Sequence, residues 1–132
     1  MKALKYALFF FFVVDVTMFI LFQTHPALLL SALPQFDIDS AGGAYPRLVG
    51  ILFLALGLAR LYGGLFMHQK GAFVVSMWSW VIEIIYTISE LIHGQFTLIE
   101  NMMALILAPL MFIWSLSYYL KIFPTEAEII NK

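Results

Sequence analysis

Five ionisable side chains lie within or at the ends of long apolar runs, and they are the residues best placed to do chemistry. Asp15, Arg60 and Glu83 interrupt the middle of a run, whereas Arg47 and Glu90 lie near the ends. An ionised group inside a bilayer costs about 2.5–3.5 kcal/mol on insertion scales, so such groups face a protein interior and pair with one another. They predict a polar core that is either a network of ion pairs or a cavity for a ligand.

The spacing of these charges predicts which of them meet. If the second and third apolar runs fold back on each other as a hairpin, the helical rise places Arg47 level with Glu90. Glu83 is then about 8 Å deeper than Arg60, within reach of a long guanidinium group. Asp15 is expected within a turn or two of Arg60. We therefore expect Arg47 to pair with Glu90, and Arg60 to pair with Glu83 or Asp15.

Glu83 and Glu90 are seven residues apart and share one helix face, with Tyr86 between them. They are about 10 Å apart along the axis, too far for a direct carboxylate dyad. Trp80, three residues before Glu83, and Tyr86 are candidates for the wall of a ligand pocket around a cation or a flat ring. Ordinary aromatic packing is the alternative interpretation.

Three glycines recur every seven residues, at Gly50, Gly57 and Gly64. A stripe of small residues permits close helix–helix approach, so we interpret it as a packing surface.

Metal and cofactor sites have little support in the sequence. There is no cysteine, and His25, His68 and His93 fall singly near predicted helix ends. Haem and di-iron centres need paired ligands at facing depths. We therefore predict no metal, no cofactor and no enzymatic activity.

The elements that position these residues follow from composition. Of 132 residues, 63% are hydrophobic and 11% charged, with a net charge of −1; soluble domains have about half apolar and a quarter charged residues. This excludes a soluble enzyme, a disordered tail and a nucleic-acid binder. The apolar runs predict an all-α polytopic membrane protein, a single domain forming a four-transmembrane-helix bundle. Its helices are expected at about 6–25, 46–67, 72–92 and 102–122, with a polar tail over 123–132.

Orientation follows from the lysines and arginines of the loops. With four crossings, five lysines fall on the side of the two termini, whereas Arg47 lies on the other side near the acidic loop over 34–44. Both termini are therefore expected on the cytoplasmic side or its organellar equivalent.

The chain resembles the ergosterol biosynthetic protein 28 family, small four-helix membrane proteins of the endoplasmic reticulum. The residues that carry the resemblance align without a gap over the second and third helices, and a short segment of the fourth helix follows: Arg47, Gly50, Arg60, His68-x-Lys70, Trp78, Ser89-Glu90-Leu91 and Gly94, then Ala108-Pro109-Leu110-Met111. Tyr86 and Glu83 depart from the pattern, standing where a histidine and a small residue are expected.

The resemblance implies a non-catalytic scaffold that tethers the sterol C-4 demethylation enzymes in the endoplasmic reticulum, with Arg47, Arg60 and Glu90 in its polar core. One alternative is a supernumerary subunit of a respiratory or photosynthetic complex, in an organellar inner membrane. Another is an intramembrane sterol- or lipid-binding protein or isomerase that uses Glu83 and Glu90. The expected partners are other integral membrane proteins and lipids, and not nucleic acid.

Overall fold

The computed structural model describes residues 2–25, 44–93 and 98–123 of the chain. All four long elements within these ranges are α-helices, which confirms the predicted all-α four-helix fold. The predicted loop over 34–44 and the predicted polar tail over 123–132 fall almost wholly outside the described residues.

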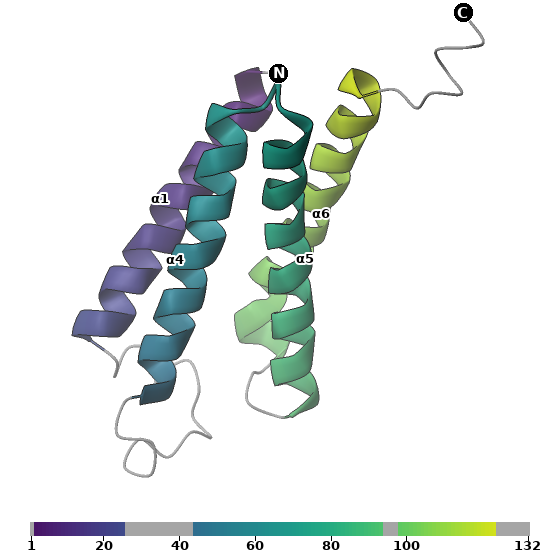
Figure 1. Cartoon of the computed structure of the whole chain (residues 1–132). Coiled ribbons are helices and arrows are strands. Elements are labelled where there is room, and N and C mark those ends of the chain that lie inside the picture. Colours follow the sequence, from purple (N-terminus) through teal and green to yellow (C-terminus); the bar gives the residue numbers. More distant parts are fainter. Residues whose placement is uncertain (1, 26–43, 94–97, 124–132) are drawn as a thin grey trace, which may run out of the picture.

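Each helix runs antiparallel to the one before it in the chain (Figure 1). The start of the first helix, the connection between the second and third, and the end of the fourth therefore lie at one end of the molecule, here called the turn end. The opposite end is called the far end. The helices are α1 (Lys2–Thr24), α4 (Ala44–Leu65), α5 (Lys70–Ile92) and α6 (Leu98–Ile122).

All four helices begin earlier than predicted, α4 and α5 by two residues and α1 and α6 by four. α1 begins at Lys2 rather than at residue 6, and α6 begins at Leu98 rather than at residue 102. Neither added segment contains Gly or Pro, so nothing in it interrupts helical hydrogen bonding beyond the apolar run. Glu100, expected in a loop, consequently belongs to α6, although its side chain is outside the described part. α6 also continues as one helix through Pro109.

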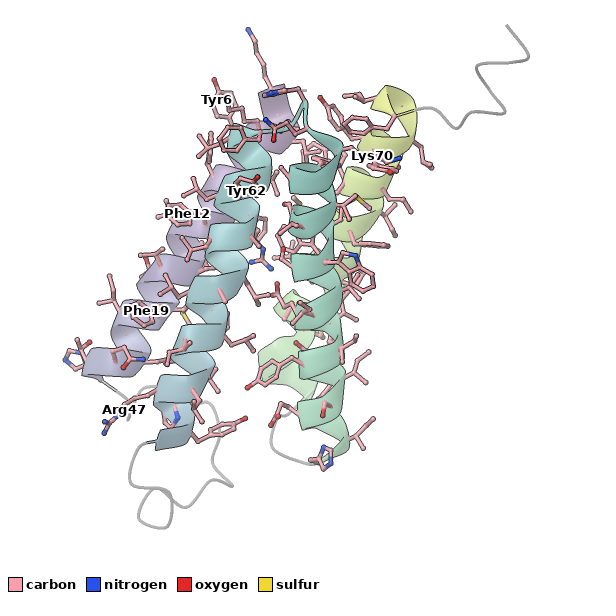
Figure 2. All side chains as sticks on the ribbon, in the orientation of Figure 1. Tyr6, Phe12, Phe19, Arg47, Tyr62 and Lys70 are labelled. Carbon is pink, nitrogen blue, oxygen red and sulfur yellow. The ribbon has the colours of Figure 1, made fainter. Side chains whose placement is uncertain are left out.

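All four helices are long and apolar enough to cross a membrane, and the chain is an integral membrane protein. The distribution of side chains fits this environment, because large apolar groups point outward from every helix (Figure 2). Tyr6, for example, is 67% exposed and Ile113 is 58% exposed. Among the described residues, the buried polar and charged side chains are Asp15, Arg60, Ser76, Ser79, Thr87 and Ser115.

Helices that follow each other in the chain pack together: α1 on α4, α4 on α5, and α5 on α6. α4 and α5 lie closest near the turn end and separate toward the far end (Figure 1). A cluster of apolar side chains from α1, α5, α6 and the α4–α5 turn fills the interior at the turn end: Leu4, Leu8, Met67, Phe73, Met77, Trp80, Ala108 and Met111. A smaller cluster around Phe22 and Val49 joins α1 to α4 near the far end.

Candidate functional site: a buried arginine joining three helices

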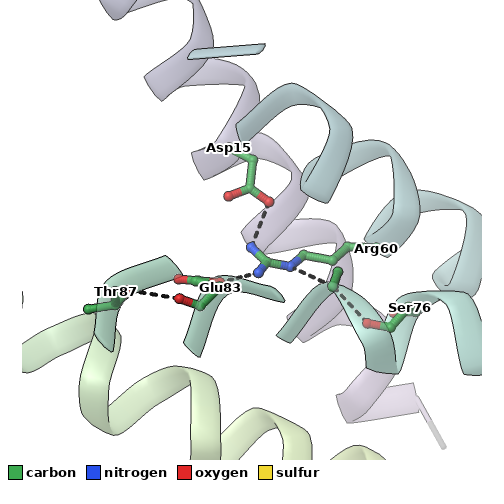
Figure 3. A network of polar contacts seen from close by, with 6 residues as sticks. Asp15, Arg60, Ser76, Glu83 and Thr87 are labelled. Atoms are coloured by element: carbon green, nitrogen blue, oxygen red, sulfur yellow. Dashed lines mark hydrogen bonds and ion pairs between the residues drawn. The ribbon is translucent and has the colours of Figure 1, made fainter. Parts of the chain in front are cut away.

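Arg60 lies at the centre of the polar core and contacts two helices besides its own (Figure 3). Its Nη1 donates to Oδ2 of Asp15 on α1 at 2.7 Å, and its Nη2 forms an ion pair with Oε2 of Glu83 on α5. Its Nε donates to Oγ of Ser79 on α5 at 3.2 Å. The Arg60 side chain is 1% exposed. Each of its three nitrogen atoms therefore holds a neighbouring helix. We call Arg60, Asp15, Glu83 and Ser79 the Arg60 cluster.

The spacing alone left open which acid pairs with Arg60, and the structure shows that both do. A guanidinium group presents its terminal nitrogens in a planar fork, so two carboxylates can approach from different directions. Asp15 reaches one branch from α1 and Glu83 reaches the other from α5.

Gly57 makes the approach of Asp15 possible. A Cβ atom added to Gly57 would lie 2.8 Å from Cβ of Asp15, closer than real side chains allow. Gly57 precedes Arg60 by three residues, so both lie on neighbouring parts of one α4 face. The glycine therefore brings α1 near enough for the Asp15 carboxylate to reach the guanidinium group.

A second close contact brings α5 to the other side of α4. A Cβ atom added to Gly63 would lie 2.3 Å from Cβ of Ser76. Ser79, one turn further along α5, donates its hydroxyl proton to the Ser76 carbonyl oxygen at 2.6 Å and accepts from Arg60. The charges alone did not indicate these residues. The available signal was two serines three residues apart in the otherwise apolar stretch 72–82 of α5.

Two aromatic rings pack at the Arg60 guanidinium group. Cζ of Arg60 lies 3.7 Å from the ring centroid of Trp80. Phe11 of α1 meets the same indole edge to face, with ring centroids 5.0 Å apart. Trp80 is 1% exposed. Trp80, a candidate for the wall of a ligand pocket, is therefore in contact with Arg60 and Phe11 instead.

The cluster contains two carboxylates for one guanidinium group. The Asp15 side chain is 3% exposed and that of Glu83 is 18% exposed. Electrostatic attraction is strong at such sites because the surroundings screen it poorly. Removing Arg60 would leave the buried Asp15 and the partly buried Glu83 without their cation, so the arrangement depends on Arg60.

Near the far end a separate polar contact joins α4 to α5. The hydroxyl of Tyr45 donates to Oε2 of Glu90 at 2.9 Å, and it lies 3.1 Å from the hydroxyl of Tyr86. Tyr86 also packs against the apolar cluster around Phe22 and Val49. Tyr86, the other candidate for a ligand wall, therefore forms part of an interhelical contact.

The expected pairing of Arg47 with Glu90 is wrong. Arg47 is exposed and forms no ion pair with any described residue, while its carbonyl oxygen accepts a hydrogen bond from Nε2 of Gln23 at 3.0 Å. Arg47 and Glu90 lie at matching depths along their helices, but the Arg47 side chain does not point toward Glu90. Tyr45 points toward α5, and a residue two positions further on lies about 200° around the helix, so Arg47 points away from Glu90.

The heptad glycines all face α1. Cβ atoms added to Gly50 and Gly64 would lie 3.2 Å from Cβ of Phe22 and 3.5 Å from Cβ of Leu8, respectively. With Gly57 they form a continuous surface along which α4 packs on α1. Gly63, on a different face, serves the same purpose toward α5.

Within the described ranges, no group of three or more His, Asp or Glu side chains could hold a metal ion. Chemically, the Arg60 cluster is a set of charge-assisted hydrogen bonds between three helices. No family model, curated protein or solved structure matches the chain.

Proposed function

We propose that this protein is a non-catalytic membrane scaffold. The observation that carries the proposal is the closed geometry at Arg60, whose three nitrogens all bind neighbouring helices while Trp80 covers the guanidinium face. Charged groups used in this way specify how helices assemble. The outward faces of α1 and α6 carry large apolar side chains, which suit contacts with lipids and other membrane proteins.

The resemblance to the ergosterol biosynthetic protein 28 family gives the proposal its specific form. On this basis the scaffold tethers the enzymes of sterol C-4 demethylation in the endoplasmic reticulum, with both termini on the cytoplasmic side. Of the polar residues that carry the resemblance, Arg60 is buried in the core and Glu90 joins α5 to α4 through Tyr45. Gly94, which also carries it, lies outside the described residues.

The same contacts weigh against a sterol or lipid isomerase. Such an activity requires Glu83, Glu90 and Trp80 to face a space that admits a substrate. Instead, Glu83 binds Arg60, Glu90 accepts from Tyr45, and Trp80 packs on Arg60.

Affinity purification of the tagged full chain in a mild detergent, followed by mass spectrometry, tests the scaffold. Co-purification of sterol C-4 demethylation enzymes is the expected result. Subunits of a redox complex would instead favour a structural subunit of that complex. A chain that purifies alone under conditions that preserve known membrane complexes would contradict both.

Two variants separate specific assembly from hydrophobic capture. Gly57→Leu removes the space that Asp15 occupies and is expected to displace α1, so it should lose the partners. Gly71→Ala adds a Cβ atom with no atom within 4 Å and should retain them. If both variants co-purified the same amount of partner proteins, the binding would be adventitious.

A further inference from the structure

A pocket at the turn end lies between the start of α1 and the end of α4, away from the Arg60 cluster. It measures about 250 Å³ and is lined by Lys2, Lys5, Gly64, Leu65, Met67 and His68. This volume is just below the about 300–1,000 Å³ of pockets for drug-sized ligands. The pocket suits a compact chemical group.

The polar lining of the pocket is basic. Lys2 and Lys5 are three residues apart on α1 and reach the same helix face, and His68 lies across from them in the α4–α5 turn. Nζ of Lys5 lies 5.5 Å from the ring centroid of Phe9, which directs this side chain along the surface of α1. Neither lysine has an ion pair with a described residue. The pocket therefore offers positive charge without a described counter-ion.

The pocket lies at the ends of two helices long enough to cross a membrane, which is where lipid headgroups are expected to meet the hydrocarbon region. The membrane-crossing segment of α1 begins here, at Lys2, and that of α4 ends here, at Leu65. Tyr6 and Tyr62 lie near this end (Figure 2) and are 67% and 46% exposed, as expected for an aromatic belt at a membrane interface. Leu65 combines a place in the pocket lining with 50% exposure, so an apolar chain can continue from the pocket along it.

We propose that this pocket binds a phosphate group, with its negative charge on Lys2 and Lys5 and a hydrogen bond from His68. Lysine is a common phosphate ligand in proteins, and basic residues at this depth attract anionic lipids. The phosphate belongs either to an anionic phospholipid or to a soluble phosphate compound. This site is independent of the proposed scaffold function.

Native mass spectrometry of the full chain in a maltoside detergent, which contains no phosphate, tests the site. Phosphatidylglycerol is expected to bind, and a diacylglycerol with the same acyl chains is not. Lys2→Gln/Lys5→Gln should weaken binding about 30-fold, since each lysine near a membrane surface contributes about 1 kcal/mol. Lys2→Arg/Lys5→Arg should retain it.

The control is Lys70→Gln/Lys121→Gln, which removes the same charge from the same end outside the pocket lining. Leu65→Trp is a second test, because it fills the pocket without altering charge and should also weaken binding. If inorganic phosphate alone stabilises the full chain against unfolding, and Lys2→Gln/Lys5→Gln loses this effect, the site is supported. Its ligand would then be a soluble phosphate compound. Equal weakening in the two glutamine pairs, or equal binding of diacylglycerol, would overturn the proposal.

Discussion

Nη1 of Arg60 on α4 lies 2.7 Å from Oδ2 of Asp15 on α1, directly beside the glycine that admits Asp15. Charge pairing and close backbone approach therefore occur at the same α1–α4 contact. The two effects depend on each other. Without the space at Gly57 the carboxylate would be held too far away, and without the carboxylate the close approach would lose its strongest polar contact.

Replacing Arg60 with leucine is expected to destabilise the protein by about 3–5 kcal/mol, because the buried Asp15 and the partly buried Glu83 would lose their cation. The loss can be measured by unfolding the variant in mixed micelles and following tryptophan fluorescence. Trp80 packs directly on Arg60 and should report the change.

A triple variant, Asp15→Asn/Arg60→Leu/Glu83→Gln, is the control for this experiment. It removes all three charges together, and most of the stability lost in Arg60→Leu should return. A triple variant no more stable than Arg60→Leu would show that the cost comes from lost packing rather than from uncompensated charge.

Gly63→Ala is expected to destabilise the α4–α5 contact, since the added Cβ atom would meet Cβ of Ser76 at 2.3 Å. Overpacking of this kind costs about 1–3 kcal/mol. Ser76→Gly removes the obstructing atom, so the double variant should recover much of the loss. Unfolding measurements on the single and double variants give the coupling between the two positions.

Gly71→Ala provides the comparison, because nothing lies within 4 Å of its added Cβ atom. Alanine is the better helix former by about 1 kcal/mol, so this variant should be neutral or slightly stabilising. If all glycine-to-alanine changes in α4 and α5 behaved alike, helix propensity rather than interhelical contact would explain them.

Much of the fold and the centre of the site could be predicted from the sequence. Helix number and type follow from long apolar runs separated by polar segments. The meeting of Arg60 with Glu83 follows from the short α4–α5 turn, which sets the relative depth of the two helices. Asp15 was expected near Arg60 because the two residues lie at similar depths along their helices.

Rotation of a helix about its axis could not be predicted in the same way. Arg47 and Glu90 have matching depths, yet Tyr45 occupies the face that meets Glu90. The direction of a side chain depends on packing against other helices, which depth alone does not specify. The contact between Gly63 and Ser76 was missed for the same reason, since it becomes visible only when the facing residue on α5 is known.

Oxidation of a Leu8→Cys/Gly64→Cys variant is expected to link α1 to α4. A Cβ atom at Gly64 would lie 3.5 Å from Cβ of Leu8, at the short end of the about 3.5–4.5 Å found in disulfides. The natural chain has no cysteine, so no other pair competes. Protease cleavage between the two helices followed by electrophoresis would reveal the link.

Phe10→Cys/Gly64→Cys is the matched control. Phe10 is 63% exposed and lies about 200° around α1 from Leu8, so its sulfur should not reach Gly64. Equal cross-linking of both pairs would contradict the packing of the glycine surface on α1.

Single cysteines should report which ends of the helices share one side of the membrane. The turn end carries Lys2, His68 and Lys121, whereas Thr24 lies at the far end, and all four are exposed. In sealed vesicles with the cytoplasmic face outward, an impermeant maleimide should label the first three and should label Thr24→Cys only after permeabilisation, because loop lysines favour the cytoplasmic side. Labelling of Thr24→Cys alone would reverse the orientation while preserving the fold. Labelling of Lys2→Cys and Lys121→Cys from opposite sides would contradict four crossings.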